Sequence, residues 1–140
     1  MHIEHQVKRG ALFCQFETGA QRSDATGKGR YDLLSPWALR RLARHMEAGV
    51  TEGGYEPRNW ERGIPVHRFF DSAIRHLYSW LAGDRSEDHL AAGLWNIHGL
   101  IHTLEMVHAG RLPADLTAGL PEGHPDRIAP EKERPDDARP

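Results

Sequence analysis

The sequence contains a single cysteine, Cys14, and no apolar run long enough to cross a membrane. One cysteine excludes an internal disulfide framework and any zinc site built from several cysteines. A membrane-spanning helix needs about 20 consecutive apolar residues, so none is expected. The charged N-terminal residues are not followed by the apolar segment of a signal peptide, and we therefore expect a cytoplasmic protein.

The sequence also lacks an excess of either charge. Its 18 Lys and Arg residues nearly balance its 20 Asp and Glu residues, which leaves a net charge of -2. Binding to a nucleic acid polymer is therefore not expected, because it needs a clear cationic excess. The length of 140 residues fits one domain, or one domain with a tail. Histidine, by contrast, is abundant, with ten residues.

Three segments carry the signals of helices. The first begins at Ser35-Pro36, where serine suits the N-cap and proline suits the first helical position, and it ends near Gly49. The second spans about residues 65–82 and has one wide apolar stripe at helical spacing. The third is expected to begin at Ser86 and to end before Gly110. The link between the last two is so short that they should form an antiparallel hairpin.

The remaining segments predict loops and a tail. Residues 1–29 read as an N-terminal arm and loop, with residues 11–16 extended, and residues 51–64 read as a long ordered loop. Residues 119–140 hold five of the nine prolines and few aliphatic side chains, so a disordered tail is expected. No convincing alternating strand is present in the body. The sequence therefore predicts an all-α fold, a small helical bundle over residues 1–118 followed by the tail.

Polar groups are expected to face each other across the predicted hairpin. Asp71 and His76 lie on its first helix, and His89 and Asn96 lie on its second. Carboxylates and imidazoles that meet between helices are a common way for bundles to bind divalent metals. The alternative is a solvated helix face with internal ion pairs among Arg68, Asp71 and Arg75, and a histidine at the edge of the core.

A second polar stripe lies on the last predicted helix. His98, His102 and Glu105 are spaced so that they share one face. This stripe has the spacing of a zinc site without the glutamate of a metalloprotease helix, and it is also a face that a homo-oligomer could bury.

Two loops carry residues suited to a nucleotide. The segment 27–32 places Lys28 and Arg30 between glycines ahead of a helix, which suits a phosphate group or an ordinary basic loop. In the segment 55–63, Asn59 and Trp60 have the chemistry to stack on a base and bind its edge. The alternative is that Trp60 pins the loop to the core.

Four motifs follow one another in residues 19–105: R-[YF]-D-L from Arg30, R-N-W-x-x-G from Arg58, D-x-x-x-R-H from Asp71 and H-L-A-x-x-x-W-N from His89. As an ordered set they resemble the N-terminal domain of the phage-type dATP/dGTP diphosphohydrolase family, related to the MazG- and MazZ-like all-α nucleotide pyrophosphohydrolases. If the gene is carried by a phage, the host cytoplasm is the expected location.

The resemblance implies an enzyme that hydrolyses deoxypurine nucleoside triphosphates, dATP or dGTP, to the monophosphate and pyrophosphate with Mg²⁺ or Mn²⁺ as cofactor. It implies three sets of site residues: catalytic Asp71, His76 and His89; metal-binding Asp71, His76, Asp88 and His89; and substrate-binding Lys28, Arg30, Asn59, Trp60, Arg68, Arg75 and Asn96.

The sequence also departs from the MazG-like pattern. Those enzymes present E-x-x-E on one helix and E-x-x-D on the next, whereas residues 71–74 and 89–92 here supply fewer carboxylates. A non-catalytic helical module that senses nucleotides or binds a protein is therefore the alternative. A triphosphohydrolase of the HD type ranks lower, because no His-Asp dipeptide is present. Three helices leave a thin core, so a homo-oligomer is expected.

Overall fold

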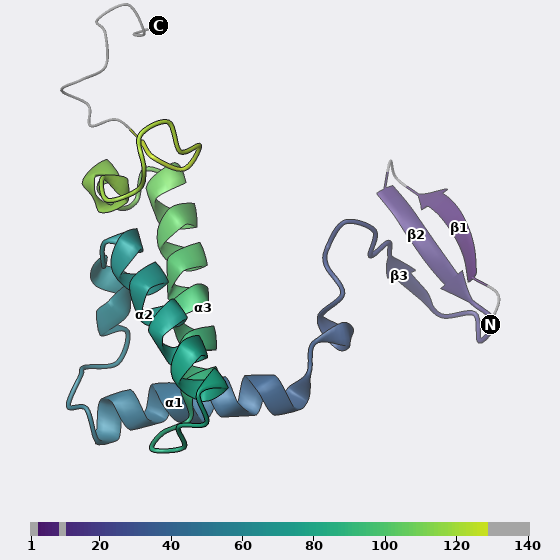
Figure 1. Cartoon of the computed structure of the whole chain (residues 1–140). Coiled ribbons are helices and arrows are strands. Elements are labelled where there is room, and N and C mark those ends of the chain that lie inside the picture. Colours follow the sequence, from purple (N-terminus) through teal and green to yellow (C-terminus); the bar gives the residue numbers. More distant parts are fainter. Residues whose placement is uncertain (1–2, 9–10, 129–140) are drawn as a thin grey trace, which may run out of the picture. The chain divides into compact units, whose positions relative to one another are not determined.

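The computed structural model of the chain describes residues 3–8 and 11–128 (Figure 1). Its contacts divide the chain into two compact units, Met1–Leu34 and Ser35–Pro140. None of the helices in the described residues has the length and apolar character that crossing a membrane requires.

The N-terminal unit is built on a three-stranded antiparallel sheet in the order β1-β2-β3 (Figure 1). Strand β1 (Ile3–Lys8) pairs with β2 (Ala11–Phe16), and β2 pairs with β3 (Gln21–Ser23). Gly19, with a φ of 83°, turns the chain between β2 and β3. The expectation of an all-α fold is therefore wrong for this unit, because residues 11–16 belong to a sheet and the loop that follows contains a strand.

The sequence pattern does not reveal the whole sheet, because β3 is short. Leu12, Cys14 and Phe16 alternate along β2, but β3 has only three residues and all of them are exposed. Such a strand is stabilised by hydrogen bonds to a neighbouring strand, which the periodicity of its own residues does not report. A single turn of 3-10 helix, η1 (Tyr31–Leu33), ends the unit.

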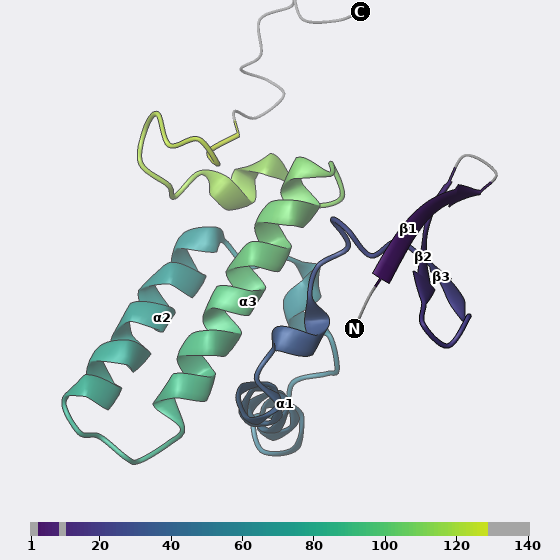
Figure 2. The same ribbon diagram turned by 90° about the vertical axis from the view of Figure 1, so that its right-hand side faces the viewer.

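Helices α2 (Val66–Leu81) and α3 (His89–His108) form the predicted antiparallel hairpin (Figure 2). They approach closely because small residues line the buried side of α3. An ideal Cβ on Gly99 would lie 2.5 Å from Cε1 of Phe69, whose ring is almost fully buried. The prediction of three helices is confirmed. The main buried residues of the hairpin are Val66, Phe69, Ala73, Ala91, Ala92, Gly93, Asn96, Gly99, Thr103 and Val107.

Helix α1 (Pro36–Thr51) lies across the end of the hairpin at which α2 ends and α3 begins (Figures 1 and 2). The Ser35 hydroxyl caps it by accepting a hydrogen bond from the Ala38 N–H at 3.2 Å, as the sequence predicts. Two contacts hold it against α3: the bidentate ion pair of Arg41 with Asp88, and the tilted ring pair of His45 with Trp95. No residue of α1 is buried, so it covers the hairpin end without adding a core of its own.

The loop expected at residues 51–64 is ordered by one aromatic side chain. Its 3-10 turn, η2 (Asn59–Arg62), places the Trp60 ring centroid 5.1 Å from that of His98 and 4.8 Å from that of His102. Edge-to-face contacts of this kind stabilise the packing of an indole beyond the effect of the area that it buries. The loop is therefore attached to α3 through Trp60.

A third 3-10 turn, η3 (Ala114–Thr117), follows α3. The buried Thr117 hydroxyl donates to the Ala114 carbonyl and accepts from the Ile128 N–H at 2.9 Å. The first part of the segment expected to be a disordered tail, residues 119–128, thus contacts the helical unit. Residues 129–140 of that tail lie outside the described residues.

Candidate metal centre

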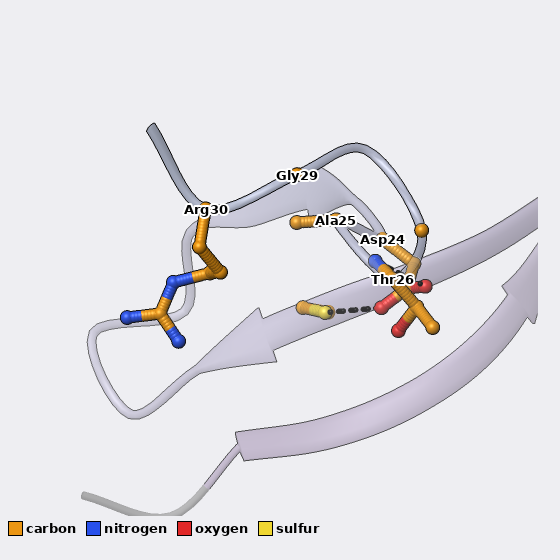
Figure 3. Close-up of a pocket in the computed structure, with 7 residues that line it drawn as sticks. Asp24, Ala25, Thr26, Gly29 and Arg30 are labelled. Atoms are coloured by element: carbon orange, nitrogen blue, oxygen red, sulfur yellow. Dashed lines mark hydrogen bonds between the residues drawn. The ribbon is translucent and has the colours of Figure 1, made fainter. Parts of the chain in front are cut away.

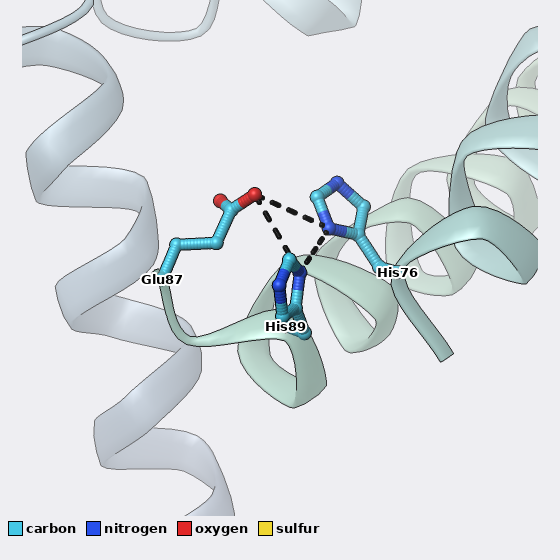
Figure 4. A group of neighbouring side chains, drawn as sticks. All are labelled: His76, Glu87 and His89. Atoms are coloured by element: carbon cyan, nitrogen blue, oxygen red, sulfur yellow. Dashed lines mark hydrogen bonds and ion pairs between the residues drawn. The ribbon is translucent and has the colours of Figure 1, made fainter. Parts of the chain in front are cut away.

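Two histidines meet where the hairpin closes. The Nδ1 atoms of His76, near the end of α2, and His89, the first residue of α3, lie 3.0 Å apart (Figure 4). The His89 side chain is 5% exposed and that of His76 is 20% exposed. The two imidazoles expected to face each other across the hairpin are therefore in contact.

Local backbone motifs explain this proximity. Helix α2 ends in a Schellman motif, in which Gly83 has a φ of 89° and its N–H donates to the Trp80 carbonyl while the Asp84 N–H donates to that of Ser79. Only a glycine adopts this conformation without strain. The motif reverses the chain immediately after the helix, so that α3 begins beside the last turns of α2.

Glu87 completes a group of three ligands with the two histidines, called here the His–Glu–His cluster (His76, Glu87 and His89). Its Oε1 lies 3.6 Å from Nδ1 of His76 and 3.5 Å from Nδ1 of His89 (Figure 4). The sequence places Glu87 inside the third helix, but the helix begins two residues later, at His89. Asp88 is the N-cap and adopts an inverse γ-turn, with φ and ψ of -78° and 77° and the His89 N–H donating to the Glu87 carbonyl. This turn brings the Glu87 side chain back over the imidazoles.

Asp84 lies behind His89, on the side away from the cluster. Its Oδ2 is 3.0 Å from Nε2 of His89, at an angle outside that of a regular hydrogen bond, so the contact is chiefly electrostatic. Its Oδ1 accepts the Ser86 N–H at 2.8 Å. The backbone and side-chain hydrogen bonds of Ser86, followed by the interaction with His89, lower the pKa of Asp84 to about 2. An aspartate anion therefore faces the outer nitrogen of His89.

Asp88, which the resemblance places among the metal ligands, is occupied elsewhere. Its Oδ1 and Oδ2 accept from Arg41 at 2.5 and 2.8 Å, and Oδ1 also accepts the Ala91 N–H at 3.1 Å. The hydrogen bonds from Arg41 lower the pKa of Asp88 to about 2. Both oxygens of Asp88 thus bind Arg41 of α1, and Oδ1 also caps α3.

The surroundings favour the neutral form of His76 by lowering its pKa. Burial lowers its pKa, Glu87 opposes that effect, and the nearby His89, Arg75 and His45 add to it. A neutral imidazole is the form that binds a metal ion. His45 and Arg75 are therefore electrostatic neighbours of the cluster, one from α1 and one from α2.

The dimensions of the cluster fit a metal ion. The three ligand atoms are separated by 3.0, 3.5 and 3.6 Å. An ion equidistant from them would lie about 2 Å from each, which is the usual bond length of a first-row divalent ion to nitrogen or oxygen. Among the described residues, His76, Glu87 and His89 form the group of three potential metal ligands. Their ligand atoms all lie within 4.8 Å of one another.

The other site residues expected on the hairpin are not members of the His–Glu–His cluster. Asp71 and Arg75 form an exposed i, i+4 ion pair at 3.2 Å on α2, and Arg68 on the same helix is exposed. Asn96 is buried, and its Nδ2 donates to the Ala92 carbonyl of its own helix at 2.8 Å. Asp71 and Asn96 therefore have polar partners on their own helices.

Three of the residues expected in the two loops, Trp60, Lys28 and Arg30, contact other residues of the protein. Trp60 contacts His98 and His102, and it follows Asn59 in η2. In the N-terminal unit, Lys28 donates to the Ser23 hydroxyl at 3.3 Å, and Arg30 forms a bidentate pair with Asp32.

A hollow in the N-terminal unit is lined by Cys14, Asp24, Ala25, Thr26, Gly27, Gly29 and Arg30 (Figure 3). The Cys14 thiol donates to Oδ1 of Asp24 at 3.5 Å. Desolvation, followed by the hydrogen bond to Asp24, raises the pKa of the thiol. A raised pKa disfavours the thiolate, so Cys14 has no character of an activated nucleophile.

Sequence reasoning missed three residues at the centre. Glu87 and Asp84 were not among the expected ligands, and Arg41 was not expected to hold Asp88. A signal for Glu87 exists, because Asp88 is as good an N-cap as Ser86 and a cap at Asp88 leaves Glu87 outside the helix. No local signal indicates that Arg41 meets Asp88, since 47 positions separate them.

The profile of the family described as dATP/dGTP diphosphohydrolase, N-terminal, matches residues 18–110. The match covers more than half of the chain, including α1, η2, α2, α3 and the His–Glu–His cluster. The chain belongs to this family. No curated protein and no solved structure matches the chain significantly. Membership in the dATP/dGTP diphosphohydrolase family suggests a hydrolase-related role and a nucleotide as the molecule bound, and the family domain matched is the N-terminal one.

Proposed function

We propose that the chain hydrolyses dATP or dGTP to the deoxynucleoside monophosphate and pyrophosphate with the help of a divalent metal ion. The observation that carries the proposal is the His–Glu–His cluster, which lies inside the segment that matches the dATP/dGTP diphosphohydrolase family. In the reaction, water adds across the bond between the α- and β-phosphates. Its oxygen joins the α-phosphorus, pyrophosphate leaves, and a proton is released.

In this proposal the metal ion is held by Nδ1 of His76, Nδ1 of His89 and Oε1 of Glu87. When bound, a divalent ion neutralises phosphate charge and makes a coordinated water more acidic, as required for attack on phosphorus. Glu87 takes the ligand role that the resemblance gives to Asp88, because both oxygens of Asp88 contact Arg41. His76 and His89 contribute imidazole nitrogens from two helices that pack tightly.

Cationic side chains beside the cluster are proposed to bind the triphosphate. Arg75 precedes His76 on α2 and is exposed, and Asp71 contacts its Nε at 3.2 Å and so restricts its orientation. Arg68 lies two turns earlier on the same helix. Asp71 is thus a positioning residue for Arg75 in this proposal. The roles of Lys28 and Arg30 toward phosphates, and of Asn59, Trp60 and Asn96 toward the nucleotide, remain proposals from the family resemblance.

The products identify the reaction. Purified full-length protein is incubated with each dNTP and Mn²⁺ or Mg²⁺, and the products are separated by ion-exchange chromatography. Monophosphate together with pyrophosphate, with dATP or dGTP preferred, is the expected result. Free triphosphate would instead identify chemistry of the HD type. Hydrolysis of the pyrimidine nucleotides alone would contradict the assignment of a deoxypurine substrate.

A non-catalytic nucleotide sensor or protein-binding module is the second candidate. The observation that favours it is the single carboxylate of the cluster, since Asp71 and Asp88 are both paired with arginines. In the same samples, a melting temperature that rises with nucleotide concentration in the absence of turnover would support this candidate.

We also propose that the chain forms a homodimer through one face of the hairpin. Two apolar stripes with the same 4-3-4 spacing follow the outer sides of α2 and α3, and a hollow lined by Leu77, Leu81 and Leu90 joins them. This apolar hairpin face consists of Phe70, Ile74, Leu77, Leu81, Leu90, Leu94, Ile97 and Ile101.

The exposed area of the apolar hairpin face supports a second copy of the chain as its partner. Apart from the half-buried Leu90, each of its side chains is between 37% and 69% exposed, and none carries a charge. Together they expose on the order of 600 Å², which approaches the about 800 Å² per partner of a stable interface. Two identical hairpins packed on this face would complete a four-helix bundle.

A further inference from the structure

The donors of the His–Glu–His cluster are two imidazole nitrogens and one carboxylate oxygen. Imidazole nitrogen suits first-row transition ions such as Mn²⁺, Fe²⁺, Co²⁺ and Zn²⁺. Magnesium is usually bound by oxygens, keeps several waters and binds imidazole poorly. The family resemblance allows either Mg²⁺ or Mn²⁺ as the cofactor. The nitrogen ligands of the cluster therefore favour Mn²⁺ over Mg²⁺.

Two imidazole nitrogens bind one ion only if both present a lone pair. A neutral imidazole carries a proton on one nitrogen and a lone pair on the other. His76 and His89 point their Nδ1 atoms at each other and at Oε1 of Glu87 (Figure 4). The cluster thus binds a metal best when the proton of each ring lies on the outer nitrogen, Nε2.

Asp84 supplies the group that favours this state of His89. Its carboxylate lies 3.0 Å from the buried Nε2, so a proton on that nitrogen is stabilised and the lone pair is left on Nδ1. The Ser86 N–H, which donates to the other oxygen of Asp84, fixes the position of the carboxylate. A carboxylate behind a ligating histidine orients the ring and makes it a stronger donor.

We propose that Asp84 is a positioning residue that holds His89 with its proton on Nε2, and that the His–Glu–His cluster is consequently a site for a first-row transition ion that discriminates against Mg²⁺. The inference rests on the metal centre of the proposed function and deepens it. The affinity of the cluster for metal ions can be measured without nucleotide turnover.

The same geometry allows a competing arrangement. If the proton of the neutral His76 ring lies on Nδ1, this N–H donates a hydrogen bond to Nδ1 of His89. The two rings then form a hydrogen-bonded pair that needs no metal ion. Glu87 then lies at the rim as an exposed carboxylate. The two arrangements differ in one measurable property, because only the first binds a metal tightly in the absence of nucleotide.

Cobalt is the probe, since Co²⁺ has visible absorption bands that report its ligands. Metal-free, tag-free full-length protein is titrated with Co²⁺ by absorption spectroscopy, and with Mn²⁺, Zn²⁺ and Mg²⁺ by calorimetry, without nucleotide. We expect one Co²⁺ per chain with bands typical of nitrogen ligation, which His89→Gln removes. Mg²⁺ is expected to bind at least 100-fold more weakly than Mn²⁺ and to leave the Co²⁺ bands unchanged.

The Asp84→Asn variant tests the positioning role. It keeps the size of the side chain and an oxygen for Ser86 but loses the charge, and we expect Co²⁺ to bind 10- to 100-fold more weakly with shifted bands. Asp84→Glu should restore part of the affinity. The control is Asp115→Asn, an exposed aspartate in η3, which should bind Co²⁺ like the wild type.

Three results would overturn the inference: Mg²⁺ binding as tightly as Mn²⁺, Co²⁺ binding that Asp84→Asn leaves unchanged, or no binding of Co²⁺ without nucleotide. Failure of the proposed function looks different. A chain that binds Co²⁺ as expected and hydrolyses no nucleotide refutes the enzyme, whereas turnover with Mg²⁺ and no Co²⁺ site refutes only this inference.

Discussion

The Nδ1 atoms of His76 and His89 lie 3.0 Å apart although the residues belong to different helices and are 13 positions apart in the chain. Two short backbone motifs produce this contact: the Schellman motif around Gly83 and the inverse γ-turn at Asp88. The same two motifs bring Asp84 behind His89 and Glu87 in front of it. The candidate centre is therefore a property of the connection between α2 and α3.

Close packing of the hairpin predicts a large effect at Gly99. An added methyl group would lie 2.5 Å from the Phe69 ring, which is almost fully buried. We expect Gly99→Ala to lower the free energy of unfolding by about 1–3 kcal/mol, which is the usual cost of overpacking. Chemical denaturation followed by circular dichroism measures this change.

Gly49 provides the matched control, because it is helical, in α1, and an added Cβ there meets no atom within 4 Å. Gly49→Ala should raise stability by about 0.5–1 kcal/mol, since alanine loses less conformational freedom in a helix. Equal effects of the two substitutions would show that the close approach of Phe69 to Gly99 does not limit packing.

The Arg41–Asp88 pair predicts a dependence of stability on pH. In the folded chain the pKa of Asp88 is about 2, below its ordinary value of 3.8, so the unfolded chain binds the proton first as pH falls. The stabilisation is complete above about pH 5 and is lost as the pH falls from about 4 to 2. We expect it to be less than about 1 kcal/mol, because the pair is partly exposed to solvent.

Arg41→Met tests this by urea denaturation at pH 6 and pH 3. The variant should lose less stability between the two pH values than the wild type does, while Arg111→Met, at an exposed arginine, should follow the wild type. An identical loss in Arg41→Met and wild type would mean that the ion pair does not stabilise the fold.

The apolar hairpin face predicts the oligomeric state. We expect the wild type to be a dimer in size-exclusion chromatography with light scattering, and Ile97→Asp to be a monomer. Val50→Asp is the control, since Val50 on α1 and Ile97 on α3 are both 40% exposed and only Ile97 belongs to this face. A monomeric wild type, or a dimer that Ile97→Asp leaves intact, would contradict the proposed interface.

Metal binding predicts a gain in thermal stability. An ion that binds only the folded chain stabilises it by about 2.7 kcal/mol at a concentration 100 times its Kd. Adding Mn²⁺ to metal-free protein should therefore raise the melting temperature, and a chelator should reverse the rise. Glu87→Gln should show little response. The same rise in Glu87→Gln and wild type would assign the effect to ions bound elsewhere.

Local signals predicted the helical part of the molecule. Ser35 caps α1, glycines follow α2 and α3, and the apolar stripe of α2 includes its buried residues Val66, Phe69 and Ala73. The three-stranded sheet was missed, because β3 is short, exposed and stabilised by pairing with β2. The contact between His76 and His89 follows from the antiparallel hairpin, and it was predicted for that reason.

The finer composition of the centre could not be predicted in the same way. Choosing Ser86 as the cap of the third helix put Glu87 into its first turn, and a shift of two residues changed which side chains face the imidazoles. Asp88 was assigned to the metal from the family resemblance, but its partner Arg41 comes from a helix 47 positions away. Contacts of that range depend on how α1 crosses the hairpin, which no local pattern encodes.

Restoring activity with metal tests the central claim most directly. Metal-free wild type, Glu87→Gln and the control Glu105→Gln, an exposed glutamate on α3, are titrated with Mn²⁺ while hydrolysis of dGTP and dATP is followed. Wild type and Glu105→Gln should recover activity at the same Mn²⁺ concentration, and Glu87→Gln should lose at least 100-fold in rate or in Mn²⁺ affinity. If Glu87→Gln recovers like the wild type, the His–Glu–His cluster is not the catalytic metal centre.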